Sequence, residues 1–483
     1  MNVDVAVSRA LKAGVPLICC ATPEPSATID ALRKAINSSK RVYSWDIARG
    51  YIALNEAAKK ARAPSAESPM EFFTGLEALG PDTVVLVMNL SSMVEALGMP
   101  ARQHIYNVRD VFKGVGSALI AVERSPNLPP DIAVDFYFVD VPLPDEAQLK
   151  SLVIDILNAN SLTIPEDRIA RAVDMLSGLP PFAAEQAFAL ALGKGGRIDF
   201  DLLWSIKCRT VEETPGVSIW RGRERFDQLG GLMNVKEYCL AKLRGRRRYG
   251  AVVFIDEIEK ALAGATTGTG DTSGVSQGIL QAILVYMQDM DVSGMMFIGH
   301  PGTGKSAIAK SLGNEAEIPT VILDFGALKD SLVGATERRV RNALKTITAI
   351  SNGRPLFVAT CNKIAMLPPE LRRRFTGGTF FFDLPTEEER ASIWDYYLRK
   401  YEIEDRKFPP DDGWTGAEIK ACCEGAWERN QPLIKAAEYV VPVAVAAPEQ
   451  IESLCREADG RYISASYPGF YTRNVQKVRK IAV

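Results

Sequence analysis

The sequence predicts an α/β protein with two parallel sheets, each followed by a helical segment. Short apolar strands alternate with helical stretches over the first 140 residues, and the same alternation returns from Leu229 to about Leu384. Helical patterns dominate residues 145–205 and Thr386–Arg429. Strands that are apolar along their whole length are typical of parallel sheets covered by helices on both faces. The order α/β, helical, α/β, helical indicates two copies of one two-part module.

The strands of the first half are short runs rich in β-branched and aromatic residues. The runs that we expect to be strands are Val15–Cys20, Arg41–Trp45, Thr83–Met88, Ala118–Val122 and Phe136–Val141. Helical periodicity lies between them, for example at Ala27–Ile36. A polar connector that contains Pro215 and Gly216 precedes the second half, and a tail rich in Val, Ala and Pro ends the chain.

Two segments support an internal duplication. Residues 119–149 and 356–390 share an order of features: a strand, Leu-Pro-Pro before an acidic residue, a Phe-rich strand, and an acidic helix start. Agreement over several elements predicts that the two halves are divergent copies of one module.

The composition is that of a globular chain with almost no net charge. The 483 residues include 57 Lys plus Arg and 59 Asp plus Glu, a formal net charge of −2. This balance disfavours a globally basic nucleic-acid binder, and only two histidines, His104 and His300, occur, which excludes a multi-histidine metal site. Since no apolar run approaches the roughly 18 residues that span a bilayer and no targeting segment is evident, we expect a cytoplasmic protein without a membrane partner.

A glycine-rich motif in the second half predicts nucleotide binding. Residues 299–306 are GHPGTGKS, a complete G-x-x-x-x-G-K-[ST] phosphate loop, between the apolar strand Met295–Ile298 and the helix Ala307–Leu312. Glycines let backbone N–H groups wrap phosphate oxygens, and the helix N-terminus adds a favourable dipole. Lys305 would reach the β- and γ-phosphates of ATP, and Ser306 would ligate Mg²⁺. The expected nucleotide-binding residues here are Gly299, His300, Pro301, Gly302, Thr303, Gly304, Lys305, Ser306 and Ala307, with the His300 side chain facing solvent.

A second strand supplies the carboxylates that phosphoryl transfer requires. Residues 252–260 are VVFIDEIEK, an apolar strand that ends in Asp256 and Glu257. Phosphoryl transfer needs a metal holder and a water-positioning group beside the phosphates. We therefore expect Asp256 to hold Mg²⁺ and Glu257 to polarise the attacking water. The alternative is that Asp256 is a decoy and that the protein binds ATP without hydrolysing it.

Together these motifs resemble those of the AAA+ ATPases. On that resemblance, Asn362 occupies the sensor-1 position, and Arg372, Arg373 and Arg374 form the arginine-finger region, with Arg374 the preferred finger and Arg372 the alternative. Gly230 matches the linker that contacts adenine, and Gly416 and Ala417 match the helical lid. The two halves together resemble the Ycf-type ATPases of chloroplasts and cyanobacteria and their phage relatives. The resemblance implies ATP and Mg²⁺ as ligands, and a homo-oligomer, a hexamer, whose finger arginine acts on the neighbouring subunit.

One departure from the AAA+ pattern concerns the order of the blocks. In that family the phosphate loop precedes the carboxylate strand, whereas here Asp256 lies upstream of Gly299. If the family's strand order 5-1-4-3-2 holds, the connections between strands can keep their direction and handedness. We therefore expect the transposition to leave the three-dimensional site intact.

The first copy lacks the catalytic motifs. ATPEPSAT stands where a phosphate loop would follow its first strand, and the strand Thr83–Met88 leads into Asn89 without an acidic pair. The first copy is therefore predicted to bind no nucleotide and to serve assembly or partner recognition. The expected organisation is a degenerate AAA+-like α/β domain (1–144), a helical subdomain (145–208), a linker (209–228), an AAA+ ATPase α/β core (229–384), a helical lid (385–430) and a C-terminal tail (431–483).

Three functions are compatible with these features. The first is an oligomeric ATPase that remodels a protein partner whose identity the sequence does not reveal. The second is a nucleotide-gated scaffold with little turnover, since Leu332 stands where threading ATPases carry a pore aromatic residue. The third is a nucleic-acid-associated motor or loader, which rests only on the basic cluster Arg244–Arg248. The near-neutral charge favours the first.

Overall fold

The computed structural model describes residues 3–61, 64–124, 126–262, 275–292, 294–328 and 335–473. Leu332, which distinguishes two of the candidate functions, lies outside these residues. The chain forms two compact units, one of residues 1–144 with 180–184 and one of residues 145–179 with 185–483. None of the described helices combines the length and the apolar character needed to cross a membrane.

The first unit is built on a six-stranded sheet with the strand order β3-β2-β4-β5-β1-β6. Its strands are β1 (Leu17–Ala21), β2 (Arg41–Asp46), β3 (Gly50–Ala53), β4 (Thr83–Met88), β5 (Ala118–Glu123) and β6 (Tyr137–Asp140). All neighbours pair in parallel except β2 and β3, which form an antiparallel hairpin at one edge. The five strands expected from the sequence are present, and β3 is an addition that sequence reasoning missed.

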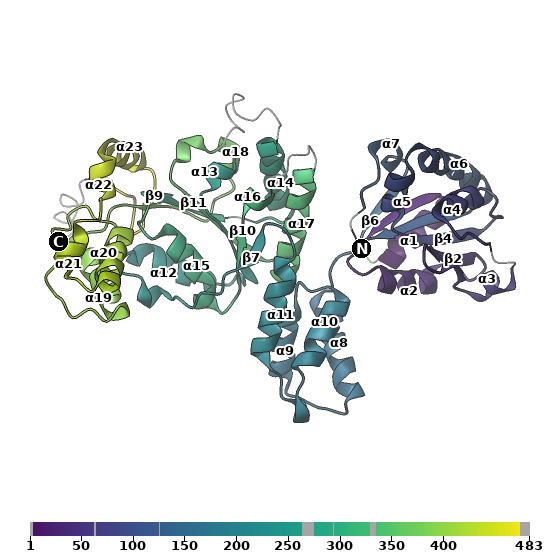
Figure 1. The fold of residues 1–483 in the computed structure, drawn as a ribbon, viewed down its shortest axis with the longest axis horizontal. Helices are drawn as coiled ribbons and strands as arrows, with labels where there is room; N and C mark the ends of the chain where they lie inside the picture. Colours follow the sequence, from purple (N-terminus) through teal and green to yellow (C-terminus); the bar gives the residue numbers. More distant parts are fainter. Residues whose placement is uncertain are drawn as a thin grey trace. The chain divides into compact units, whose positions relative to one another are not determined.

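Helices cover both faces of this first sheet (Figure 1). They are α1 (Val3–Lys12), α2 (Pro25–Ala35), α3 (Glu56–Lys60), α4 (Pro69–Leu76), α5 (Leu90–Leu97), α6 (Met99–Val115) and α7 (Pro130–Ala133). One apolar core packs α1 and α2 against the sheet, and a second packs α4, α5 and α6 against the other face. Burial on both faces explains why the strands are apolar throughout.

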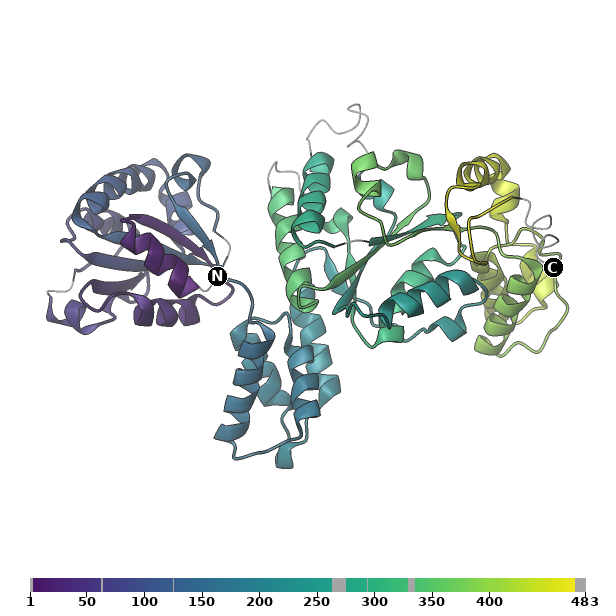
Figure 2. The same cartoon turned by 180° about the vertical axis from the view of Figure 1, so that it is seen from behind.

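A group of helices connects the two sheets in the chain. It consists of α8 (Glu146–Ala159), α9 (Glu166–Leu176), α10 (Pro181–Ala191), the 3-10 turn η1 (Lys194–Gly196) and α11 (Phe200–Glu212). Helix α9 packs against both α8 and α11 (Figure 2). The Ser177 hydroxyl lies 2.7 Å from both Ala349 O and Asn352 Oδ1, so this helical group is joined to the second α/β core.

The second sheet has seven strands in the order β13-β12-β9-β11-β8-β10-β7. They are β7 (Val217–Ile219), β8 (Ala251–Ile255), β9 (Gly294–Gly299), β10 (Thr320–Leu323), β11 (Pro355–Cys361), β12 (Thr379–Phe382) and β13 (Ile463–Ser464). Only the pairing of β10 with β7 is antiparallel. The strand that leads into the phosphate loop, β9, lies beside β11, and the carboxylate strand β8 lies on the far side of β11.

The carboxylate strand keeps the place in the sheet that the AAA+ strand order predicts, although its block is transposed in the chain. Numbered by the roles expected from the sequence, the phosphate-loop strand β9 is strand 1, β10 is strand 2, the carboxylate strand β8 is strand 3, β11 is strand 4 and β12 is strand 5. The neighbours β12-β9-β11-β8-β10 then have the order 5-1-4-3-2, although β8 precedes β9 in the chain. The carboxyl ends of β8, β9 and β11 therefore meet at one edge of the sheet. The first sheet has the same order, β6-β1-β5-β4-β2, with its strands in the simple chain sequence.

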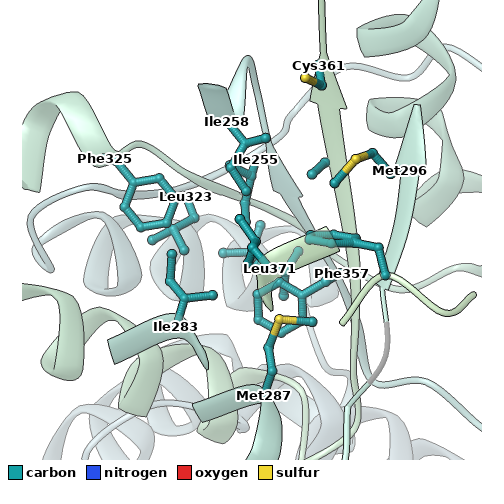
Figure 3. Packing of buried hydrophobic residues seen from close by; sticks show 14 of the residues in the cluster. Ile255, Ile258, Ile283, Met287, Met296, Leu323, Phe325, Phe357, Cys361 and Leu371 are labelled. Carbon is teal, nitrogen blue, oxygen red and sulfur yellow. The ribbon is translucent and has the colours of Figure 1, made fainter. Parts of the chain in front are cut away.

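Two apolar cores hold helices on the faces of the second sheet (Figure 1). Helices α12 (Met233–Leu243) and α15 (Lys305–Ala316) cover one face, and α14 (Val275–Asp289) and α17 (Ala335–Ile350) cover the other. Figure 3 shows the second of these cores, in which Ile283 and Met287 of α14 pack toward Phe357 and Leu371. The remaining elements of this core are η2 (Phe226–Gln228), α13 (Ile258–Ala261), α16 (Phe325–Leu328), η3 (Ile364–Met366) and α18 (Pro369–Arg372).

The C-terminal part of the chain is more ordered than the sequence predicts. Helices α19 (Glu387–Lys400), α20 (Gly416–Arg429), α21 (Leu433–Ala437), α22 (Val443–Ala446) and α23 (Pro448–Ala458) follow the sheet. The segment expected to be a tail contributes β13, which pairs in parallel with β12, and buries Cys455 and Tyr471 in the main core. The connector expected at 209–228 likewise contains β7, an edge strand of the sheet. Strand β7 and the described residues from Cys455 to Tyr471 thus belong to the α/β core, whereas Leu433 and Ala436 pack with the helices that follow the sheet.

Candidate functional site

A cavity of about 510 Å³ opens at the carboxyl ends of β9, β8 and β11. Its volume lies in the usual range of small-molecule sites. It brings together most of the residues that the sequence singled out. Predicted site residues that line it are Gly230, Asp256, Glu257, Pro301, Gly302, Thr303, Gly304, Lys305, Ser306, Ala307, Asn362, Gly416 and Ala417.

The phosphate loop depends on its glycines for its backbone path. Gly302 has φ +81°, and a Cβ there would lie 2.7 Å from Thr415 Oγ1 and 2.9 Å from Ala417 Cβ. A Cβ at Gly299 would lie 2.1 Å from Phe382 O, in a neighbouring strand. The Ala417 N–H donates to Gly302 O at 3.2 Å, so the start of α20 touches the loop directly. Larger residues at these positions would push the lid and the strand away from the loop.

Lys305 is buried at the start of α15. Its Nζ donates to Gly299 O at 2.9 Å and to His300 O at 2.6 Å, inside the curve of the loop. Burial lowers the pKa of Lys305 to about 8, and the nearby carboxylates of Glu259, Asp256 and Glu257 oppose the shift. An amine held among backbone carbonyls in a cavity is placed to meet anionic oxygens.

Asp256 follows β8 and forms the polar floor of the cavity. Its Oδ1 accepts from Ser306 Oγ at 2.8 Å and from Thr360 Oγ1 at 2.6 Å. The Thr360 hydroxyl also accepts from the Glu257 N–H at 2.8 Å. Thr360 thus fixes both acidic residues, a role that sequence reasoning missed. The available signal was its position two residues before Asn362, since alternate residues of an extended chain point to the same side.

Glu257 and Asn362 meet across the ends of two adjacent strands. Asn362 Nδ2 donates to Glu257 Oε1 at 3.0 Å, and Lys260 Nζ lies 2.5 Å from Glu257 Oε2. Glu257 has φ +47°, in the left-handed region, so the chain turns sharply where this carboxylate enters the cavity. A buried carboxylate that the sequence did not single out, Glu259, accepts from the Asn362 N–H at 2.9 Å.

The other wall of the cavity is apolar and aromatic. Leu229 and Leu232 precede α12, and Ile393, Tyr396 and Tyr397 come from α19. A Cβ at Gly230 would lie 2.6 Å from the Ile393 side chain, so the linker can follow α19 closely only with glycine there. This wall offers apolar and π surface to a planar group.

The prediction that the His300 side chain faces solvent is wrong. The side chain is 2% exposed, and its ring packs edge-on against Phe381 with centroids 5.9 Å apart. Its Nε2 lies 3.6 Å from Cys455 Sγ, in a segment 155 residues further along the chain. The residue is buried because the C-terminal segment folds over the sheet. The His300 carbonyl oxygen accepts from Lys305, and His300 is not among the residues that line the cavity.

The two candidate finger arginines lie apart from the cavity of their own chain. None of the described residues that line the cavity is an arginine. Arg372 ends α18, and Arg374 Nη2 donates to Gln288 Oε1 at 2.8 Å, beside α14.

Comparisons with known proteins agree with this architecture. The family model described as SpoVK-like AAA ATPase, N-terminal domain, matches residues 4–141, and the model of the ATPase family associated with various cellular activities (AAA) matches residues 295–352. The uncharacterized AAA domain-containing protein ycf46 of Guillardia theta is 22% identical over an alignment of 507 residues. The alignment covers 92% of this chain and 92% of the Guillardia protein. The ycf46 protein of Pyropia yezoensis is 22% identical over 96% of this chain and 100% of its own. Over most of its length this chain is therefore similar to the Ycf46 AAA domain-containing proteins.

Part of this Ycf46-like chain also resembles other AAA proteins. The ATP-dependent zinc metalloprotease FtsH of Karelsulcia muelleri is 24% identical over 30% of this chain and 32% of its own. Among solved structures, the match to the FIGL-1 AAA domain covers 38% of this chain and 85% of that domain's chain, at 16% identity and a TM-score of 0.27. The AAA model match begins in β9, downstream of the carboxylate strand β8, and the N-terminal match spans the first sheet from α1 to β6.

Proposed function

We propose that this Ycf46-like chain binds and hydrolyses Mg-ATP, and that it uses the turnover as a homo-oligomer to remodel a protein partner. One observation carries the proposal. Lys305, Ser306, Asp256, Glu257 and Asn362, which come from three different strand ends, converge on one cavity. This set combines a cation for phosphate, oxygen ligands for a metal, and a positioned carboxylate.

The residues of the phosphate loop bind and orient the nucleotide in this proposal. Lys305 exchanges its two backbone carbonyl partners for phosphate oxygens, and the N–H groups at the start of α15 face the same oxygens. The apolar wall of Leu229, Ile393 and Tyr397 packs against the base. Contact with both the linker and the lid lets the bound nucleotide influence the position of α20 relative to the loop.

The floor of the cavity fits a magnesium ion. Ser306 Oγ and Asp256 Oδ1 lie 2.8 Å apart, and both are hard oxygen ligands of the type that Mg²⁺ prefers. When bound, Mg²⁺ would neutralise charge on the phosphates. Thr360 holds the Asp256 carboxylate in place, so the ligand set is oriented before the nucleotide arrives.

Glu257 is the residue placed to act on water. Its Oε1 is fixed by the Asn362 amide at 3.0 Å, and its backbone is fixed by Thr360. A carboxylate held in this way can orient a water molecule and accept its proton. Asn362 acts here as a positioning residue, since it contacts the carboxylate.

An oligomer completes the proposed site. Phosphoryl transfer is accelerated by an arginine that meets the transferred phosphate, and the cavity-lining residues described for this chain include none. We assign that role to Arg374 of a neighbouring subunit, with Arg372 as the alternative. A hexamer follows from the AAA+ resemblance, and the net charge of −2 favours a protein partner over nucleic acid.

Phosphate release by the full-length chain tests the proposal. Lys305→Ala is expected to lose ATP binding and Mg²⁺-dependent phosphate release, because the buried cation for the phosphates is removed. Lys435→Ala, which changes an exposed lysine on α21 that does not line the cavity, serves as the control and should keep both. Turnover at the wild-type level in Lys305→Ala would overturn the proposal. Tight ATP binding by the assembled wild type without turnover would instead support a nucleotide-gated scaffold.

A further inference from the structure

Three potential metal ligands of different chemistry meet beneath the phosphate loop. His300 belongs to the loop, Asp383 follows β12, and Cys455 lies on α23. Their donor atoms all lie within 4.8 Å of one another. The His300 and Cys455 side chains are buried, whereas the Asp383 side chain is partly exposed and lines the nucleotide cavity. The cluster is separate from the Asp256 and Ser306 pair that fits Mg²⁺.

The distances within the cluster resemble those of a tetrahedral metal site. His300 Nε2 lies 3.6 Å from Cys455 Sγ, Cys455 Sγ lies 3.6 Å from Asp383 Oδ1, and His300 Nε2 lies 4.0 Å from Asp383 Oδ1. Zinc–ligand bonds of about 2.0–2.3 Å at tetrahedral angles place neighbouring ligand atoms about 3.3–3.6 Å apart. Two of the three separations fit, and the third closes with a small rotation of the Asp383 carboxylate.

The nature of the donors selects the metal. A thiolate and an imidazole are ligands that favour Zn²⁺, whereas Mg²⁺ prefers oxygen ligands only. The Tyr471 hydroxyl hydrogen-bonds with both Cys455 and Asp383, so a further oxygen lies beside the cluster. Asp383 Oδ1 also accepts from the Leu384 N–H at 2.8 Å, which orients the carboxylate while leaving it a lone pair for a metal.

We propose that His300, Asp383 and Cys455 form a zinc-binding site that joins the phosphate loop to the C-terminal segment. Binding replaces the thiol proton of Cys455, which is released to solvent, by a sulfur–zinc bond. His300 is neutral and uses Nε2 as its ligand atom. The bound ion links the loop, the end of β12 and α23, three segments that are far apart in the sequence. The proposal is independent of ATP turnover.

Binding of Co²⁺ to the full-length chain tests the site. Chelator-treated protein is expected to bind Co²⁺ stoichiometrically, with the thiolate-to-cobalt charge-transfer band and the intense visible bands of tetrahedral Co²⁺. Added Zn²⁺ should remove both signals and raise Tm, since an ion that binds only the folded state stabilises it. Absence of a charge-transfer band in the wild type would overturn the proposal.

Matched cysteine variants identify the ligand. Cys455→Ser should lose the charge-transfer band and the Tm shift, whereas Cys239→Ser, a buried cysteine on α12, should keep both. A band that persists in Cys455→Ser would contradict the assignment. If Cys455→Ser does not fold, His300→Gln is the second variant, and it should weaken Co²⁺ binding by about 10-fold or more. Asp256→Asn, which removes the proposed Mg²⁺ ligand, should keep the band even if the chain proves unable to hydrolyse ATP.

Discussion

The two sheets of this molecule share one strand order but differ at the edge where chemistry takes place. Both place the strands in the order 5-1-4-3-2 by their roles, and both add an antiparallel edge strand, β3 in the first sheet and β7 in the second. The second sheet reaches this order with a different chain path. The fold therefore depends on which apolar strands lie side by side, and two orders of connection satisfy the same packing.

The turn after the carboxylate strand shows how the copies diverge. Glu257 in the second copy has φ +47°, and Asn89 after the corresponding strand β4 has φ +57°; both immediately precede a helix. The backbone turn is thus retained while the side chain has changed. Asn is among the residues that adopt this conformation most readily. The first copy keeps the shape of the edge without the acidic pair.

In each copy a buried carboxylate links the end of a strand to the helix that follows the neighbouring strand. The carboxylate belongs to the helix in the second copy and to the strand in the first. In the second copy Glu259 of α13 accepts from the Asn362 N–H after β11. In the first copy Glu123 of β5 accepts from the Ser91 N–H of α5 at 2.6 Å and from its hydroxyl at 2.5 Å. The link between strand end and helix persists because a buried polar group must keep its partner. The segment ATPEPSAT after β1 contains no Gly-Lys pair, and Asn89 stands after β4 without an acidic pair.

The largest expected effect distinguishes the two turns. Glu257→Gln should lower ATP turnover by about 10²–10⁴-fold with ATP binding retained, because an amide cannot accept a proton from water as a carboxylate does. Asn89→Gly, the matched change in the first copy, should leave turnover unaltered, since glycine tolerates the positive φ. Steady-state phosphate release and nucleotide binding by the full-length chain measure both. Equal losses in the two variants would mean that the first copy takes part in hydrolysis.

A smaller effect is expected from the buried link of the first copy. Ser91→Ala removes the hydroxyl that donates to Glu123 and accepts from the Asn127 N–H. Removing this donor from the buried Glu123 carboxylate costs about 1–3 kcal/mol, seen as a lower unfolding midpoint of the first unit. The neighbouring exposed Ser92→Ala should change the unfolding free energy by less than about 0.5 kcal/mol. If Ser91→Ala instead lowered ATP affinity, the first copy would have a nucleotide role.

The sequence predicted the central strands and the cavity residues because both depend on short-range patterns. Apolar runs of five to seven residues mark the central strands of the second sheet, and the phosphate loop, Asp256, Glu257 and Asn362 each follow such a run directly. Glu259 was missed although it lies three residues after Asp256.

The edges of the second sheet could not be predicted in the same way. β7 has three residues and β13 has two, too few for an alternating pattern. Their pairing depends on contacts with β10 and β12, which lie far away in the sequence. The burial of His300 has the same origin, because α23 and Tyr471 approach it only in the folded chain. Local patterns contain no information about such contacts.

The smallest expected effect is a dependence of ATP affinity on pH, caused by the buried Lys305 amine. The segment ATPEPSAT that follows the first strand of the first copy contains no lysine. Burial lowers the pKa of Lys305 to about 8, so below that pH the amine is charged and attracts phosphates. Above it the free protein must take up a proton to bind ATP, and the Kd should rise by up to about tenfold per pH unit.

Calorimetric titration of ATP between about pH 7 and pH 9 measures this dependence of ATP affinity on Lys305. Lys305→Arg is the control, because a guanidinium stays charged throughout this range; its affinity should be lower but almost independent of pH. Ionisation of the nucleotide itself is common to both proteins and cancels in the comparison. Equal slopes in the two proteins would show that the Lys305 amine remains charged in the free protein. The cavity would then already stabilise the cation through Glu259, Asp256 and Glu257 against the cost of burial.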